Sequence, residues 1–165
     1  MFKKPKIKTV NLRKTDAKEI AGWSMPFTYE FTGTDGREYI ILWEHYKQNA
    51  YIIKPFNVED NTKLCDSLNF EFAEAKKAWK LYNISVIDEE RRRNGIGTAM
   101  LKTFFELIFY DGREFIEVFG NYAPMISDKH LKNFYQQFNG YSVSNGKKVK
   151  FKLIKEEEVF FFRFF

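Results

Sequence analysis

Cysteine and histidine are scarce in this sequence: Cys65 is the only cysteine, and His45 and His130 are the only histidines. One cysteine cannot form a disulfide within the chain, which favours a protein of a reducing compartment. A catalytic thiol would need a neighbour that lowers its pKa, and neither histidine lies near Cys65 along the chain. The simplest interpretation of Cys65 is a passive thiol.

Long apolar runs are missing as well. No stretch approaches the roughly 20 residues that a membrane-spanning helix needs. Lysines gather at residues 3–8, but no apolar segment follows them, as it would in a secretory signal. We therefore expect a cytoplasmic protein with no membrane partner.

The composition fits one domain over residues 1–165. Hydrophobic residues make up 44% of the chain and charged residues 30%, which is typical of globular proteins, and this length suffices for a substantial core. Lysine and arginine number 27 against 22 aspartate and glutamate, a net charge of +5. This excess suits a polyanionic cofactor, and it permits nucleic acid without requiring it, although a solvated surface explains most of the lysines.

Strand signals dominate the first half. Residues 27–32 and 38–44 are rich in aromatic and β-branched side chains and flank Gly33-Thr34-Asp35-Gly36, a hairpin turn signal. Residues 15–20 carry the N-cap signal of a short helix, and residues 71–79 could continue as a helix instead of a strand. Further strands are expected at residues 6–12, 51–53 (ended by Pro55), 68–73 and 81–87.

The second half alternates helices and strands. Apolar residues between Met100 and Ile108 recur at helical spacing, and Asp111-Gly112 ends that helix. We expect further elements at residues 115–119 (strand), 128–138 (helix, ended by Asn139-Gly140), 148–154 (hairpin strand) and 159–165 (apolar strand). This order of strands and helices predicts a mixed α/β, or α+β, domain whose central, mostly antiparallel twisted sheet is flanked by helices.

The loop between strand 81–87 and the next helix is suited to a pyrophosphate. A helix N-terminus has unpaired N–H groups and a positive partial charge. Gly95 and Gly97 let the backbone approach phosphate oxygens. Thr98 adds a hydroxyl donor, and Arg92 and Arg93 add charge-assisted hydrogen bonds. The loop lacks the Gly-Lys-Ser/Thr ending of a Walker A loop and the third glycine of a dinucleotide fingerprint.

The spacing Arg-x-x-Gly-x-Gly at residues 92–97 resembles the GNAT superfamily of acyl-CoA N-acetyltransferases. There the loop joins the fourth strand to the third helix and holds the coenzyme A pyrophosphate. A second block, residues 134–141, is similar to the family's fourth helix with its tyrosine, here Tyr135. The resemblance implies an acyl-CoA-binding core at residues 81–154, an acceptor-side variable half at residues 1–80, and a C-terminal strand at residues 155–165.

The resemblance also implies roles for individual residues. Acetyl-CoA would be the co-substrate, with no metal, and its pantetheine arm would pair with Val86 and Ile87 where that strand and strand 115–119 splay apart. A backbone N–H near the same two residues would stabilise the thioester oxygen. Asp128 stands where the family often has an asparagine that contacts the cofactor. The implied cofactor-binding residues are therefore Val86, Ile87, Arg92, Arg93, Asn94, Gly95, Ile96, Gly97, Thr98 and Asp128.

Candidate catalytic residues are Tyr135 and Glu117. Tyr135 is the implied general acid for the leaving thiolate, because the pKa of a phenol lies near that of the thiol being formed; the alternative is that it only packs. Glu117 is the best-placed base for the attacking ammonium, although a solvent-facing strand residue is the simpler interpretation. Glu44 and His45 are weaker candidates for the same role.

Three functions stay open. The leading hypothesis is an N-acetyltransferase for a small-molecule amine or a protein amino group. The second is a toxin-like acetyltransferase that acts on aminoacyl-tRNA, and the third is a non-catalytic module that binds acyl-CoA or a partner. Residues 159–165 fit a buried edge strand most simply, and also an acceptor pocket or the seam of a homodimer.

Overall fold

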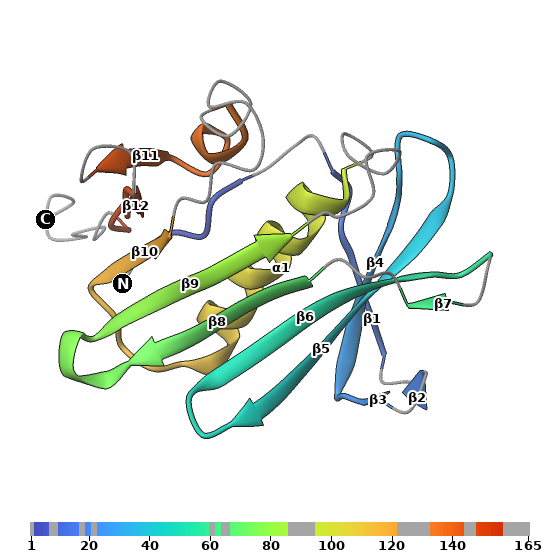
Figure 1. The fold of residues 1–165 in the computed structure, drawn as a ribbon, viewed down its shortest axis with the longest axis horizontal. Coiled ribbons are helices and arrows are strands. Elements are labelled where there is room, and N and C mark those ends of the chain that lie inside the picture. The colour runs from blue at the N-terminus through green and yellow to red at the C-terminus, as the bar shows by residue number, and fades with distance from the viewer. Residues whose placement is uncertain are drawn as a thin grey trace, which may run out of the picture.

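The computed structural model describes residues 2–6, 10–16, 19–20, 23–59, 62–63, 67–85, 95–121, 133–143 and 148–156. Of these, residues 19–20, 23–24, 46, 62–63 and 85 are described by their backbone alone. One large, curved sheet of ten strands wraps around the long helix α1, Ile96–Asp111 (Figure 1). The turn of 3₁₀ helix η1, Glu74–Lys76, joins two of the strands.

Among the described strands of this sheet, only β9 and β10 pair in parallel, and all other pairs are antiparallel. β7 (Thr62–Lys63) pairs with β6, and β2 (Glu19–Ile20) pairs with β3 (Trp23–Ser24) in a separate ribbon. The expected mixed α+β fold with a mostly antiparallel sheet is thus confirmed. The order across the sheet is β1 (Arg13–Asp16), β4 (Phe27–Thr32), β5 (Glu38–Lys47), β6 (Ala50–Asn57), β8 (Ser67–Ala73), β9 (Ala78–Ser85), β10 (Glu117–Asn121), β12 (Lys148–Phe151) and β11 (Gly140–Val143).

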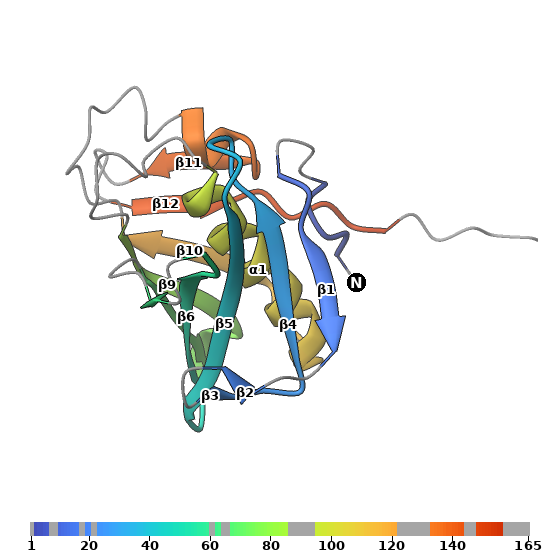
Figure 2. The ribbon, with the colours of Figure 1, turned by 90° about the vertical axis from the view of Figure 1, so that its right-hand side faces the viewer.

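The core lies between α1 and the concave face of the sheet (Figure 2). In β8, buried and half-buried residues alternate, so that Leu68, Phe70 and Phe72 share one face. The ring of Phe70 packs edge-on against Phe104 of α1, with 4.8 Å between centroids. Most of the phenylalanines in the described part of the chain are likewise buried.

A polar cluster ties the C-terminal end of α1 to the sheet. Arg113 donates to both oxygens of Asp111 (2.7 and 3.1 Å) and to Asn49 (2.6 Å), and the Tyr51 hydroxyl donates to Asp111 (2.9 Å). Burial, and then the hydrogen bond to Asp111, raise the pKa of Tyr51 to about 12, so this hydroxyl stays protonated. Burial alone would raise the pKa of Asp111, but the hydrogen bonds from Arg113 and Tyr51 together lower it.

The N-terminal segment runs across the outer side of α1 (Figures 1 and 2). The backbone N–H of Lys3 donates to Ile154 beyond β12 (2.7 Å). Lys4 forms an ion pair with Glu106 of α1 (2.9 Å), and Lys102 of α1 donates to the carbonyl of Val10 (3.1 Å). Helix α1 is thus enclosed between the sheet and this segment.

Several predicted elements agree with the structure. The hairpin is β4–β5, and its turn carries Gly36 at a φ of 80°. Helix α1 ends at Asp111, followed by Gly112 at a φ of 81°. The strand at residues 68–73 is β8, and residues 74–76 form only the 3₁₀ turn η1 instead of a continuing helix.

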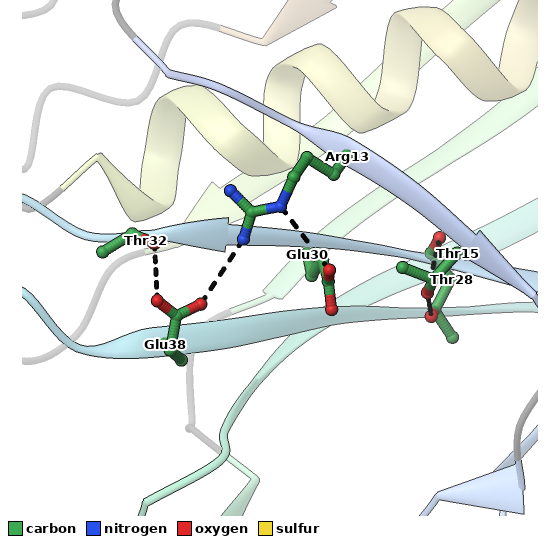
Figure 3. A network of polar contacts seen from close by, with 6 residues as sticks. All are labelled: Arg13, Thr15, Thr28, Glu30, Thr32 and Glu38. Atoms are coloured by element: carbon green, nitrogen blue, oxygen red, sulfur yellow. Dashed lines mark hydrogen bonds and ion pairs between the residues drawn. The ribbon is translucent and has the colours of Figure 1, made fainter.

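The prediction for the first twenty residues is wrong. The first strand is β1, whereas residues 6 and 10–12 lie outside any strand, and Thr15 and Asp16 pair with β4 instead of capping a helix. The hydroxyl of Thr15 lies 2.6 Å from that of Thr28, and Arg13 reaches Glu30 and Glu38 (Figure 3). These cross-strand contacts outweigh a local N-cap signal.

Pro55 does not end its strand either. β6 continues to Asn57, and Pro55 pairs with Ile41 of β5. On the other side of β6, pairing with β8 stops at Ile53 and pairing with β7 begins at Phe56. Pro55 therefore sits in the gap between two partners, where its missing N–H removes no hydrogen bond from the sheet.

The remaining predictions differ in boundary or lie outside the described residues. β9 begins at Ala78 and β10 at Glu117, so both strands are displaced from the expected ranges. Cys65, His130, the turn at residues 145–146 and the strand at residues 159–165 lie outside the described part of the chain. Within the described part, no helix combines the length and apolarity needed to cross a membrane.

Candidate functional site

The first turn of α1 has the features that the phosphate-loop prediction requires of it. Gly95 is the N-cap at a φ of 89°, and its carbonyl accepts the first helical hydrogen bond, from Ala99 (2.8 Å). No acidic residue lies in the first turn. In an α-helix the N–H groups of this turn, here of Ile96, Gly97 and Thr98, have no acceptor within the helix. They leave a partial positive charge at the start of α1.

Glycine at position 95 is required by the fold itself. A φ of 89° is the left-handed region that side chains disfavour, and an added Cβ would lie 3.2 Å from Cγ2 of Val10. Gly95 thus brings the start of α1 close to the N-terminal segment. Gly95 was predicted from the sequence to let a phosphate approach the backbone. The structure shows a further need for glycine there, its left-handed φ and its close contact with Val10.

Strands β9 and β10 part midway along β9. Their parallel pairing ends at Leu81 and Gly120. β9 then continues through Asn83 and Ile84 to Ser85, paired with β8, while β10 ends one residue later and pairs with β12. The helix begins at the end of the sheet where β9 ends (Figure 1).

The last pair before this divergence is unusually tight. A Cβ on Gly120 would lie 2.9 Å from both the Cβ and the carbonyl oxygen of Leu81. One residue further along β9 the register with β8 shifts: Asn83 pairs with Asn69, but Leu81 pairs with Phe70. Tyr82 is therefore an extra residue, a β-bulge, which bends a strand locally. The bulge at Tyr82 thus directly follows Leu81, the last residue of β9 that pairs with β10.

Tyr135 is buried at the end of the short helical stretch 133–136. Its ring packs edge-on against Phe151 of β12 (5.8 Å between centroids) and against Phe134 (5.1 Å). A Cβ on Gly140 would lie 2.8 Å from the Tyr135 carbonyl oxygen, and Asn139, at a φ of 61°, ends the helical stretch as expected. Tyr135 therefore lies on the β12 side of the parallel pair, with its ring held by packing.

Glu117 lies at the other end of that pair. It opens the pairing of β10 with β9, opposite Ala78, three residues before Gly120, which corresponds to about 10 Å along a strand. Its carboxylate is 3.1 Å from the ammonium of Lys150 on β12, and the side chain is about one-third exposed. The geometry therefore places Glu117 away from the point of divergence and in an ion pair.

The two weaker base candidates lie farther away still. Glu44 and His45 are exposed on β5, which β6 and β8 separate from β9. The imidazole of His45 stacks on Tyr51 at 4.5 Å, and its Nε2 lies 2.8 Å from the carbonyl of Gln48. Three strand spacings amount to roughly 14 Å, so neither residue is brought to the parting strands.

Six predicted cofactor residues lie outside the described part of the chain, and their roles stay predictions. Within the described part, no group of three or more histidine, cysteine, aspartate and glutamate side chains is placed to hold a metal ion. The six residues are Val86, Ile87, Arg92, Arg93, Asn94 and Asp128.

Comparisons with known proteins show a distant structural likeness. No family model matches this sequence, and no curated protein matches it. The crystal structure of nourseothricin acetyltransferase is similar over 90% of this chain and 89% of that one, with 12% sequence identity and a TM-score of 0.46. A likeness this slight decides neither family nor activity.

Sequence reasoning missed the bulge at Tyr82 and the tight approach at Gly120. The bulge and the tight approach both depend on which strands lie beside β9, and no local pattern in residues 78–85 predicts them. The signal that was available was the glycine itself: Gly120 directly follows the strand predicted at residues 115–119, and a glycine within a strand is consistent with a close backbone approach.

Proposed function

We propose that this protein is an acyl-CoA-dependent N-acetyltransferase that moves an acetyl group from acetyl-CoA to a primary amine. The observation that carries it is the arrangement at the end of β9: a strand that parts from its parallel neighbour and leads into a helix starting at Gly95. The Arg-x-x-Gly-x-Gly spacing of residues 92–97, which resembles the GNAT loop, falls on this junction.

The start of α1 would hold the coenzyme A pyrophosphate. The N–H groups of Ile96, Gly97 and Thr98 point out of the helix end, and phosphate oxygens are their natural acceptors. Arg92 and Arg93 would add charge-assisted hydrogen bonds from the preceding loop. The absence of an acidic residue from the first turn keeps the local potential favourable for an anion.

The exposed edge of β9 would hold the pantetheine arm. Beyond Leu81, residues Asn83 to Ser85 pair with β8 on one side and with no described strand on the other. An extended, amide-bearing chain can add to such an edge as a further strand does. This would direct the thioester along β9, toward the parting of the two strands.

Acetyl transfer would then proceed by direct attack. The neutral amine nitrogen attacks the thioester carbonyl carbon, a C–N bond forms, and the C–S bond breaks as the tetrahedral intermediate collapses. A backbone N–H near Val86 or Ile87 would stabilise the oxyanion. Tyr135 would protonate the leaving thiolate, and the amine proton would pass to Glu117 through water or directly to solvent.

A specific observation favours one alternative. Glu117, the best-placed carboxylate, is held by Lys150 and lies about three residues from the parting of the strands. A protein that binds acyl-CoA without transferring the acyl group would need no base. Non-catalytic binding of acyl-CoA or of a partner is therefore the second candidate.

Two measurements on the full chain separate these functions. Calorimetric titration with acetyl-CoA tests the site. We expect saturable binding of acetyl-CoA, and no comparable binding of S-acetyl-pantetheine, which keeps the thioester but lacks the pyrophosphate. Release of free coenzyme A over a panel of small amines and peptides tests transfer. Binding without release would favour non-catalytic binding of acyl-CoA. No binding of acetyl-CoA would refute the transferase and leave only the binding of a partner.

A further inference from the structure

A cavity of about 420 Å³ lies on the flank of α1. Three parts of the chain that are far apart in sequence form its walls: the N-terminal segment with Lys4, the sheet edge with Lys14 of β1 and Tyr29 of β4, and Lys102 and Glu106 of α1. The parting of β9 and β10 lies elsewhere, since β5, β6 and β8 separate β4 from β9 in the sheet. Cavities of this size are in the range that binds small molecules.

Positive charge predominates in this cavity. Three ammonium groups, of Lys4, Lys14 and Lys102, face one carboxylate, that of Glu106. Lys4 pairs with Glu106 at 2.9 Å, and Lys102 donates to the Val10 carbonyl at 3.1 Å. The ammonium of Lys14 instead rests over aromatic rings, 4.1 Å from the centroid of Phe27 and 5.9 Å from that of Tyr110. Within the described part of the chain, Lys14 has no carboxylate partner.

The rest of the lining is aromatic and apolar. Leu12, Phe109 and Tyr110 contribute apolar surface around the charges. Tyr29 is almost fully buried, and burial, followed by the negative charge of Glu106, raises the pKa of its hydroxyl above the ordinary value for tyrosine. The hydroxyl therefore stays protonated and available as a hydrogen-bond donor.

We propose that this cavity binds a small aromatic acid, a flat ring system that carries a carboxylate. The ring would lie against Phe109 and Tyr110, and the carboxylate would meet the ammonium of Lys14 and the hydroxyl of Tyr29. An aromatic ring matches the apolar walls, and an anion offsets the excess of lysines. The same excess repels a protonated amine, so the cavity does not suit the acceptor of the proposed transfer reaction.

The position of the cavity also predicts what binding would do to the fold. A ligand there would bridge the N-terminal segment, the β1–β4 edge and α1. A ligand that binds the folded state alone raises the melting temperature by mass action. Binding can therefore be followed without any assay of acetyl transfer.

Naphthoate is a suitable probe, with the neutral naphthalenemethanol as its matched control. Titration of the full chain should give saturable binding of naphthoate, with a Kd on the order of 0.1–1 mM, and a rise in Tm. The neutral alcohol should bind roughly tenfold more weakly, because it lacks the charge that the lysines attract. Equal binding of both compounds, or no binding of naphthoate, would overturn the assignment.

Three single substitutions locate the site. Lys14→Gln should weaken naphthoate binding roughly tenfold. Glu106→Gln should tighten it, because it removes the one carboxylate among the described lining residues and releases Lys4. Lys54→Gln, on β6, removes the same charge from a residue that does not line the cavity, and should leave the Kd unchanged. If Lys54→Gln weakens binding as much as Lys14→Gln, the attraction is a general surface effect and the site is refuted.

Discussion

Thr98, in the first turn of α1, allows the proposed phosphate site to be tested without damage to the fold. Thr98→Asp places a negative charge at a helix N-terminus, which stabilises the helix by about 0.5 kcal/mol. The same charge repels a pyrophosphate, so the affinity for acetyl-CoA should fall at least about tenfold. Calorimetry and thermal unfolding measure the two effects on one protein.

Thr98→Ser is the matched control, since it keeps the hydroxyl and should leave both quantities nearly unchanged. Undiminished acetyl-CoA binding by Thr98→Asp would place the cofactor elsewhere. Gly95 is a poorer position for this test. Its φ of 89° and the nearness of Val10 mean that any side chain there disturbs the fold as well as the site.

The proposed role of Tyr135 as general acid can be tested by removing its hydroxyl alone. Tyr135→Phe removes the hydroxyl and keeps the ring that packs on Phe151 and Phe134. If the hydroxyl protonates the leaving thiolate, kcat with a good acceptor should fall by about 10- to 100-fold, while the Kd for acetyl-CoA changes less than about twofold. An unchanged kcat would assign Tyr135 to packing alone.

At the scale of elements, the C-terminal end of α1 is fixed to the sheet by the cluster of Asp111, Arg113, Tyr51 and Asn49. The Asp111 side chain is only 10% exposed, and its carboxylate accepts hydrogen bonds from Arg113 and Tyr51. Asp111→Asn removes the negative charge of this carboxylate. We expect the free energy of unfolding to fall by about 2 kcal/mol at neutral pH. Urea denaturation measures it.

The same cluster makes a prediction for pH. The pKa of Asp111 is lower in the folded protein than in the unfolded chain, so its contribution to stability is complete above the unfolded pKa of about 4. It is lost as the pH falls further, through the folded pKa. Asp111→Asn should therefore lose less stability than the unaltered protein between about pH 5 and pH 2. Equal losses in both would mean that Asp111 does not contribute to the acid sensitivity.

Element prediction from sequence succeeded where the signals were local. The spacing of Met100, Phe104 and Ile108 together with Gly112 is enough to locate α1, and the turn at residues 33–36 is enough to locate the β4–β5 hairpin. It failed at Thr15 and Asp16, where an N-cap signal yields to pairing with β4. A capping hydrogen bond contributes about 1 kcal/mol, less than the strand pairing that replaces it.

At the scale of the whole molecule, the N-terminal segment holds α1 from outside. Removal of residues 2–6 would break the Lys3–Ile154 hydrogen bond, the Lys4–Glu106 ion pair and the contact of Phe2 with Phe115, whose ring centroids are 5.7 Å apart. We expect the free energy of unfolding to fall by about 1–3 kcal/mol. Chemical denaturation of the shortened and the full chain provides the comparison.

Lys4→Gln is the control for that deletion. It removes only the exposed ion pair, which is worth less than about 1 kcal/mol. If the single substitution destabilises the protein as much as the deletion does, the apolar and backbone contacts of the segment contribute nothing.

The sequence by itself determined the features that depend on neighbours along the chain: the helix with its glycine ends, the hairpin, the alternating strand β8 and the loop spacing at residues 92–97. Spacing and turn chemistry act over a few residues, so they can be read without a fold. Only the tertiary structure decided that β9 parts from β10 beyond Leu81, that Glu117 is held by Lys150, and that Lys4, Lys14 and Lys102 surround one cavity. These features join residues from distant parts of the chain, which come together only when the strands pair and α1 and the N-terminal segment pack against the sheet.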